Sequence, residues 1–184
     1  DVTATVESLP LIASSIMSKK IAAGADAILL DVKVGSGAFM KTQQAARDLA
    51  WEMVRIGQGV GRRTVALITD MDMPLGSCIG NTLEVAEACG VLQGQGDQRL
   101  TELCLELAAN MAYLAGQAAG MDEARQKARA AVESGRAFGK LCAMAQAQGG
   151  DVSVLEDWQH PRLSPLCQEV PMPESGYITA LDAE

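Results

Sequence analysis

The feature that most constrains the fold is an apolar run, an amphipathic segment and a second apolar run, which follow one another within residues 27–69. The apolar runs are Ala27–Val32 and Thr64–Thr69. The segment between them, Thr42–Gly59, has apolar residues at helical spacing. Its expected inward positions are Leu49, Ala50, Met53 and Ile56. Continuous apolar strands of this kind are usually buried on both faces of a parallel sheet. We therefore predict an α/β fold with a parallel βαβ core and a right-handed crossover.

Helices are predicted on both sides of this core. Leu9–Ala22 precedes it, with Pro10 in the first turn and Gly24 after the last turn. The helices expected after the core are Ile79–Cys89, Gln98–Gly116, Asp122–Ser134 and Arg136–Gln146. Among them, Asp122 is a candidate N-cap and Gly135 a candidate C-cap.

The last part of the chain has a different composition. Residues 151–174 contain four prolines among polar residues, which is typical of a linker. The stretch Gly176–Leu181 alternates between apolar and polar residues and is predicted to be a strand without a partner in this chain.

Composition excludes several classes of function. The net charge of −8 argues against a general nucleic-acid-binding protein, which needs a basic face. No apolar run approaches the roughly 20 residues of a membrane helix, so no membrane partner is expected. The five cysteines have no metal-binding spacing and are expected to be reduced, as in a cytoplasmic protein. The single histidine, His160, lies in a polar stretch and is expected at the surface.

Ser15 and Lys19 are the first candidate site residues. They are one helical turn apart, so both side chains project from the same face of the predicted helix. A hydroxyl and an ammonium at this separation could contact two polar atoms on one edge of a flat ring, such as a pyrimidine. On spacing alone, two ordinary exposed residues are the more economical interpretation.

Two further motifs are weaker. Gly35 and Gly37 follow the first predicted strand and suggest a phosphate-binding turn, although on spacing alone a tight strand-to-helix turn is the more economical interpretation. Asp70, Asp72, Glu84 and Glu87 could suggest a divalent cation, but their spacing matches no standard loop.

Longer strings around these motifs are more specific. They are DVTATVESLPLIASSIMSKK at the start of the chain, DVKVGSGAFM at residues 31–40 and TDMDMPLGSCIGNTLEVAE at residues 69–87. Together they resemble the thymidine phosphorylase and pyrimidine-nucleoside phosphorylase family. The resemblance is strong to about Gly96 and returns in the final GYITALDAE.

The resemblance implies roles for particular residues. Ser15 and Lys19 would be catalytic and would hydrogen-bond the pyrimidine base, with Ile12 and Phe39 as further substrate-binding residues. Lys33 would be a structural ion-pair partner. Some relatives bind a monovalent cation through two backbone carbonyls and a carboxylate, which would belong here to Leu75, Cys78 and Glu87.

The resemblance also implies an organisation. Residues 1–22 would end a small helical domain, 23–25 would be a hinge, and 26–150 would be part of an α/β phosphorylase domain. Residues 151–174 would be a linker and 175–184 the start of a C-terminal domain. Because the family's phosphate loop and one base-binding arginine match nothing in the 184 residues, we expect the chain to be an inactive part of a longer protein.

The implied activity is reversible phosphorolysis of a pyrimidine nucleoside, most simply thymidine, in nucleoside salvage. Orthophosphate would be the co-substrate, no organic cofactor would be needed, and the complete protein would be a cytoplasmic homodimer. Two alternatives remain: a related phosphorylase or phosphoribosyltransferase acting on another base or nucleotide, and an inactive truncated remnant.

Overall fold

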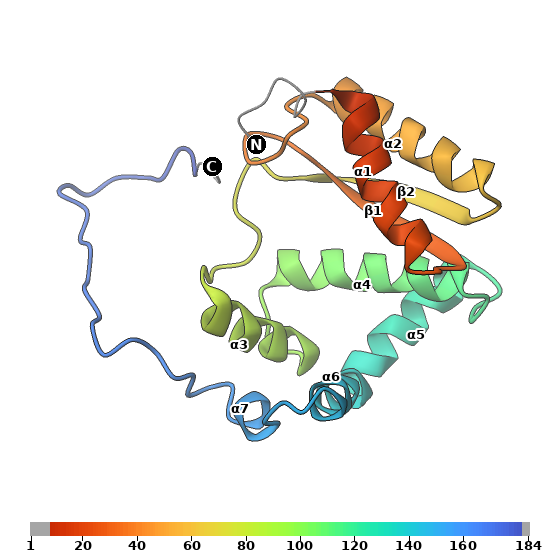
Figure 1. Cartoon of the computed structure of the whole chain (residues 1–184). Coiled ribbons are helices and arrows are strands. Elements are labelled where there is room, and N and C mark those ends of the chain that lie inside the picture. The colour runs from red at the N-terminus through yellow and green to blue at the C-terminus, as the bar shows by residue number, and fades with distance from the viewer. Residues whose placement is uncertain (1–7, 182–184) are drawn as a thin grey trace. The chain divides into compact units, whose positions relative to one another are not determined.

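The computed structural model describes residues 8–181, and Figure 1 shows its helices and strands. The elements are α1 (Leu9–Ala22), β1 (Ala27–Val34), α2 (Gln43–Gly59), β2 (Arg63–Asp70), α3 (Asn81–Leu92), α4 (Gln98–Leu114), α5 (Met121–Glu133), α6 (Arg136–Ala147) and α7 (Ser153–Glu156). The protein therefore has an α/β fold, as predicted. The described residues divide into two compact units, the first made of residues 8–74, 107–124 and 181, and the second of residues 75–106 and 125–180.

The first unit contains the predicted βαβ core. Strands β1 and β2 pair in parallel, in a register that runs from Ala27 opposite Arg63 to Val34 opposite Asp70. Thr42 is the N-cap of α2, and its hydroxyl accepts a hydrogen bond from the Ala45 N–H at 3.2 Å.

The prediction that β1 is buried on both faces is wrong for the described residues. Ile28, Leu30 and Val32 are buried, whereas the side chains between them belong to the opposite face and are more accessible. Successive side chains of a strand alternate between faces. The apolar run therefore has one face in the core, while Asp31 and Lys33 lie on the other face.

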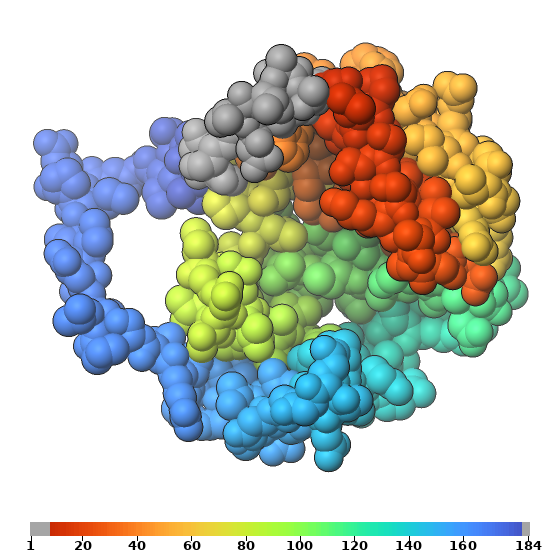
Figure 2. Space-filling model, in the orientation of Figure 1, coloured from red at the N-terminus to blue at the C-terminus, as the bar shows by residue number. Residues whose placement is uncertain are grey.

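Helices α1 and α2 pack together against the buried face of β1. Figure 2 shows the red atoms of α1 lying directly against the orange atoms of α2. The buried residues that form this core are Ala13, Met17, Ile28, Leu30, Val32, Ala46, Leu49, Ala50 and Met53. The packing is close enough that a Cβ on Gly57 would collide with the Thr64 hydroxyl and approach Met17 Cε to 3.2 Å.

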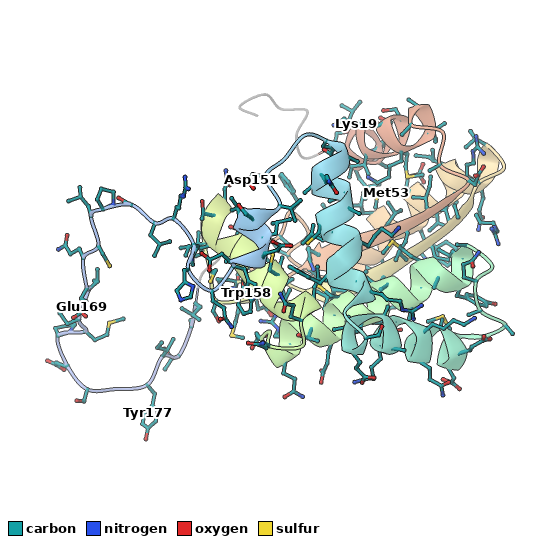
Figure 3. The ribbon with its side chains drawn as sticks, turned by 90° about the horizontal axis from the view of Figure 1, so that it is seen from below. Lys19, Met53, Asp151, Trp158, Glu169 and Tyr177 are labelled. Carbon is teal, nitrogen blue, oxygen red and sulfur yellow. The ribbon has the colours of Figure 1, made fainter. Side chains whose placement is uncertain are left out.

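The second unit is built from helices alone in its described part. Helix α3 contacts α6 and α7, and the ring of Trp158 packs against Gly90 of α3, where a Cβ would lie 3.1 Å from the ring. Arg125 makes a two-pronged ion pair with Glu106, with N–O distances of 2.8 and 3.0 Å. Figure 3 shows Glu169 and Tyr177 on the segment after α7, which leaves the helices of its unit.

Several local predictions need correction. Helix α5 begins at Met121, so Asp122 is in its first turn and is not the N-cap. Gly135, the candidate C-cap, follows α5 by two residues in a left-handed conformation, with φ of 72°, and is also the N-cap of α6. The predicted linker contains a short helix, α7, and Gly176–Leu181 forms no strand. An extended segment without a hydrogen-bonded neighbour has nothing to form a ladder with.

Candidate functional site

Ser15 and Lys19 both lie exposed on α1, and Lys19 is labelled in Figure 3. The buried side of this helix carries Ala13 and Met17. Ile12 is seven residues before Lys19, so the two project within about 20° of each other at 100° per residue. Ser15 is four residues before Lys19 and projects about 40° from it, so the three residues share one side of the helix, with Ser15 the farthest from the buried Ala13 and Met17.

A pocket of about 460 Å³ opens beside this helix, within the first unit. Helix α1 contributes Ile12, Ile16 and Lys20, and α2 contributes Leu49 and Met53. Residues 29–33 of β1 and the turn residues Phe39 and Met40 complete the lining. Two of the four predicted substrate residues, Ile12 and Phe39, thus line the same pocket.

The other two predicted substrate residues, Ser15 and Lys19, are not among the lining residues of this pocket. The lysine that lines it is Lys20, which is half-buried. Sequence reasoning gave Lys20 no role, although it lies four residues after Ile16 and eight after Ile12, which puts all three on one helical face.

The pocket runs along the open edge of β1. Its lining includes five consecutive residues of that strand, whose side chains alternate between the two faces. A cavity at the edge of the strand can touch all five, and β2 pairs with the opposite edge. The open edge makes one wall of the pocket a row of main-chain polar groups beside apolar side chains.

The turn that carries Phe39 is held by Asp72. The Asp72 carboxylate accepts a hydrogen bond from the Ser36 N–H at 2.9 Å, and the Asp72 carbonyl accepts one from the Ser36 hydroxyl at 3.1 Å. Gly35 has φ of 133°, and a Cβ there would lie 2.6 Å from the same carboxylate. The Gly-rich turn is therefore fastened to the turn that follows β2.

Three polar side chains form a closed cluster on the accessible face of the sheet. Lys33 Nζ lies 2.7 Å from an oxygen of Asp31 and donates to the Thr69 hydroxyl at 2.9 Å. The Thr69 hydroxyl in turn donates to the other Asp31 oxygen at 2.5 Å. The structural ion pair implied for Lys33 is present, and both of its members also line the pocket.

The second unit holds the predicted cation residues in one place. Glu87 Oε1 accepts a hydrogen bond from the Ser77 N–H at 2.7 Å, so its carboxylate lies on the turn that contains Leu75 and Cys78. A Cβ on Gly76 would collide with that carboxylate. Carboxylate and carbonyl oxygens are donors that hard cations prefer. Among residues 8–181, no three His, Cys, Asp or Glu side chains gather as a metal-binding group.

The remaining candidate groups belong to the second unit and are not lining residues of this pocket. His160 is exposed, as predicted, with its Nδ1 2.8 Å from an Asp157 oxygen. Burial, and secondarily the nearby Cys142, raise the pKa of the Cys89 thiol. All five cysteines are free. No helix in the described part of the chain has the length and apolarity needed to cross a membrane.

Comparison with known proteins gives a consistent result. Residues 1–138 match the model of the glycosyl transferase family, a/b domain. A pyrimidine-nucleoside phosphorylase of Staphylococcus aureus strain bovine RF122 / ET3-1 is 54% identical over 184 residues, which is 98% of this chain and 42% of that protein. The pyrimidine-nucleoside phosphorylase of strain USA300 gives the same identity and coverage.

The chain thus spans less than half the length of these curated relatives. The family match covers more than two thirds of the chain and includes α1, β1, α2 and β2. On that match, the chain belongs to the glycosyl transferase family that is defined by this a/b domain.

Proposed function

We propose that the full-length protein containing this chain catalyses the reversible phosphorolysis of pyrimidine nucleosides. Orthophosphate would displace the base and yield a pentose 1-phosphate. The observation that carries the proposal is the 54% identity to pyrimidine-nucleoside phosphorylases over 98% of the chain. It is supported by the pocket of the first unit, where Ile12 and Phe39 provide apolar walls suited to a base or a sugar.

The leaving pyrimidine gains negative charge as the glycosidic bond breaks. A cation and a hydrogen-bond donor fixed near its carbonyls stabilise that charge more than they stabilise the neutral substrate, which lowers the barrier. We assign these roles to Lys19 and Ser15, which project from one side of α1 with Ile12. No step of this scheme calls for an organic cofactor.

The finer parts of the proposal concern substrate and setting. We propose thymidine as the main substrate, a role in nucleoside salvage, and a cytoplasmic homodimer. Leu75, Cys78 and Glu87 would contribute to a monovalent cation site. We also propose that the 184-residue chain alone is inactive, because neither the described residues nor the matched motifs provide a phosphate-binding loop.

The test is a product assay with the full-length protein. Thymidine or uridine is incubated with and without orthophosphate, and free base and pentose 1-phosphate are quantified. Base release that depends on phosphate, with one pentose 1-phosphate per base, is the expected result. Base release without phosphate would indicate a hydrolase, and the absence of any base release would reject the proposal.

A further inference from the structure

The cluster of Asp31, Lys33 and Thr69 has features that an ion pair serving the fold alone does not need. Asp31 and Lys33 are both on β1, two residues apart and on one face, and Thr69 is directly opposite Lys33 on β2. All three are near the carboxyl ends of parallel strands. In open α/β sheets, ligands characteristically bind at that end.

The cluster also borders the candidate substrate pocket. Asp31 and Lys33 line it together with Ile12 and Phe39. Their side chains remain about a quarter exposed, at 25% for Asp31 and 27% for Lys33. A ligand that reaches the open edge of β1 would therefore lie beside these two residues.

The hydrogen bonds within the cluster leave capacity for one more partner. An ammonium has three donors, and Lys33 directs two of them to Asp31 and Thr69. Each Asp31 oxygen has one partner within the cluster and can accept another. The pair therefore offers a spare donor beside a spare acceptor.

The charge balance selects the kind of ligand. The Asp31 carboxylate neutralises Lys33 at contact distance, so this wall presents no net positive charge to a phosphate. Lys20 provides the pocket's other cation, from α1. A hydroxyl group, which both donates and accepts, matches a neutral donor–acceptor pair better than an oxyanion does.

We propose that Asp31 and Lys33 bind a hydroxyl group of the nucleoside's pentose: Lys33 donates a hydrogen bond to the hydroxyl oxygen, and an Asp31 oxygen accepts a hydrogen bond from the hydroxyl O–H. Thr69 is a positioning residue that holds the two side chains at this spacing. This inference rests on the proposed function, and it makes the cluster a determinant of which pentoses are accepted.

The experiment pairs variants of the full-length protein with substrates that each lack one hydroxyl. The kcat/KM is measured for uridine, 2′-deoxyuridine, 3′-deoxyuridine and 5′-deoxyuridine, with wild type, Lys33→Met and Asp31→Asn. With substrates that retain the bound hydroxyl, each variant should lose about 10- to 100-fold, as expected for a hydrogen bond to a charged group. With the one analogue that lacks this hydroxyl, the loss should fall to about twofold or less.

Further variants separate this role from a structural one. Asp31→Asn and Thr69→Val nearly preserve side-chain volume, and Thr69→Val should give the same substrate pattern with a smaller loss. Arg62→Met is the matched control, because Arg62 pairs with Asp26 at 3.4 Å at the amino ends of the same strands. It should leave all four values within about twofold of wild type.

An equal loss with all four nucleosides would overturn the inference and leave the cluster a purely structural role. A change confined to the KM of orthophosphate would also overturn it, in favour of an anion site. If wild type released no base from any nucleoside, the proposed function itself would fail. That result is distinct from an active wild type whose variants lose the same activity with all four nucleosides.

Discussion

Helices α2 and α6 both have apolar residues at helical spacing, but they differ in what those residues contact. Helix α2 buries Ala46, Leu49, Ala50, Met53 and Gly57, whereas α6 has no buried residue. The difference comes from the neighbouring elements, because α2 packs on a two-stranded sheet and on α1, while α6 has only a small contact with α3. An amphipathic pattern thus predicts a helix, and the extent of burial depends on what the rest of the polypeptide provides.

The sharpest test of this comparison replaces one methionine in each helix and compares the losses of stability. Met53 of α2 is 2% exposed and Met144 of α6 is 52% exposed. Met53→Ala should cost about 2–5 kcal/mol of unfolding free energy because it leaves a cavity. Met144→Ala should cost no more than about 0.5 kcal/mol. Hydrogen exchange of the β1 and α6 amides measures the loss of unfolding free energy in each variant. Similar losses in the two variants would mean that α6 is packed as tightly as α2.

A second test concerns the turn that positions Phe39. Gly35→Ala should destabilise the first unit by about 1–3 kcal/mol, since φ of 133° strains any side chain and the new Cβ would meet Asp72. Gly59→Ala is the control, with nothing within 4 Å of its Cβ, and should change stability by less than about 1 kcal/mol. Urea denaturation followed by near-ultraviolet signals reports the difference. A Gly35→Ala variant as stable as wild type would contradict the packing of this turn on Asp72.

Helix capping gives a smaller effect that is comparable in the two units. Thr42 caps α2, and an Asp97 carboxylate oxygen accepts the Leu100 N–H at 2.9 Å at the start of α4. Replacing either residue with Ala should cost about 1 kcal/mol locally. Amide exchange should accelerate in the first turn of α2 for Thr42→Ala and of α4 for Asp97→Ala. Acceleration of both helices by either change would indicate that the units unfold together.

The smallest expected effect is a difference in the rate at which two cysteine thiols are chemically labelled. Burial raises the pKa of Cys89, so less thiolate is present at a given pH than for an exposed cysteine. Cys89 should therefore react with iodoacetamide more slowly at pH 8 than the exposed Cys167. Mass spectrometry of peptides from a labelling time course measures both rates. Equal rates would show that α3 opens readily in the second unit.

The sequence predicted the helices and strands better than it predicted which other elements they contact. Helix α1 has the predicted bounds, and both strands extend one or two residues beyond the apolar runs. Periodicity reveals these elements because it depends on local residue order. It does not reveal that β1 has an open edge in the described part of the chain, nor that Gly176–Leu181 forms no strand, because both depend on which other strands are present.

The predicted site residues are only partly brought together in the structure. Ile12 and Phe39 line one pocket, whereas Ser15 and Lys19 do not line it. The motif strings gave no role to Lys20, whose place in the pocket depends on a small difference in direction around α1. They also did not predict the contacts of Asp72 with Ser36, because the two residues are distant in sequence. The Asp31–Lys33 pair was expected to be structural, and its place in the pocket appears only in three dimensions.

The most direct test of the proposed function compares Lys19→Ala with Lys20→Ala in the full-length protein. The resemblance assigns the base contact to Lys19, whereas the pocket is lined by Lys20. The account predicts that Lys19→Ala lowers kcat/KM for thymidine phosphorolysis by about 100-fold or more, or about 3 kcal/mol, through loss of charge stabilisation on the leaving base. Lys20→Ala, about 100° away around the helix, should have a much smaller effect. Equal losses, or a larger loss for Lys20→Ala, would contradict the assignment of the catalytic cation to Lys19.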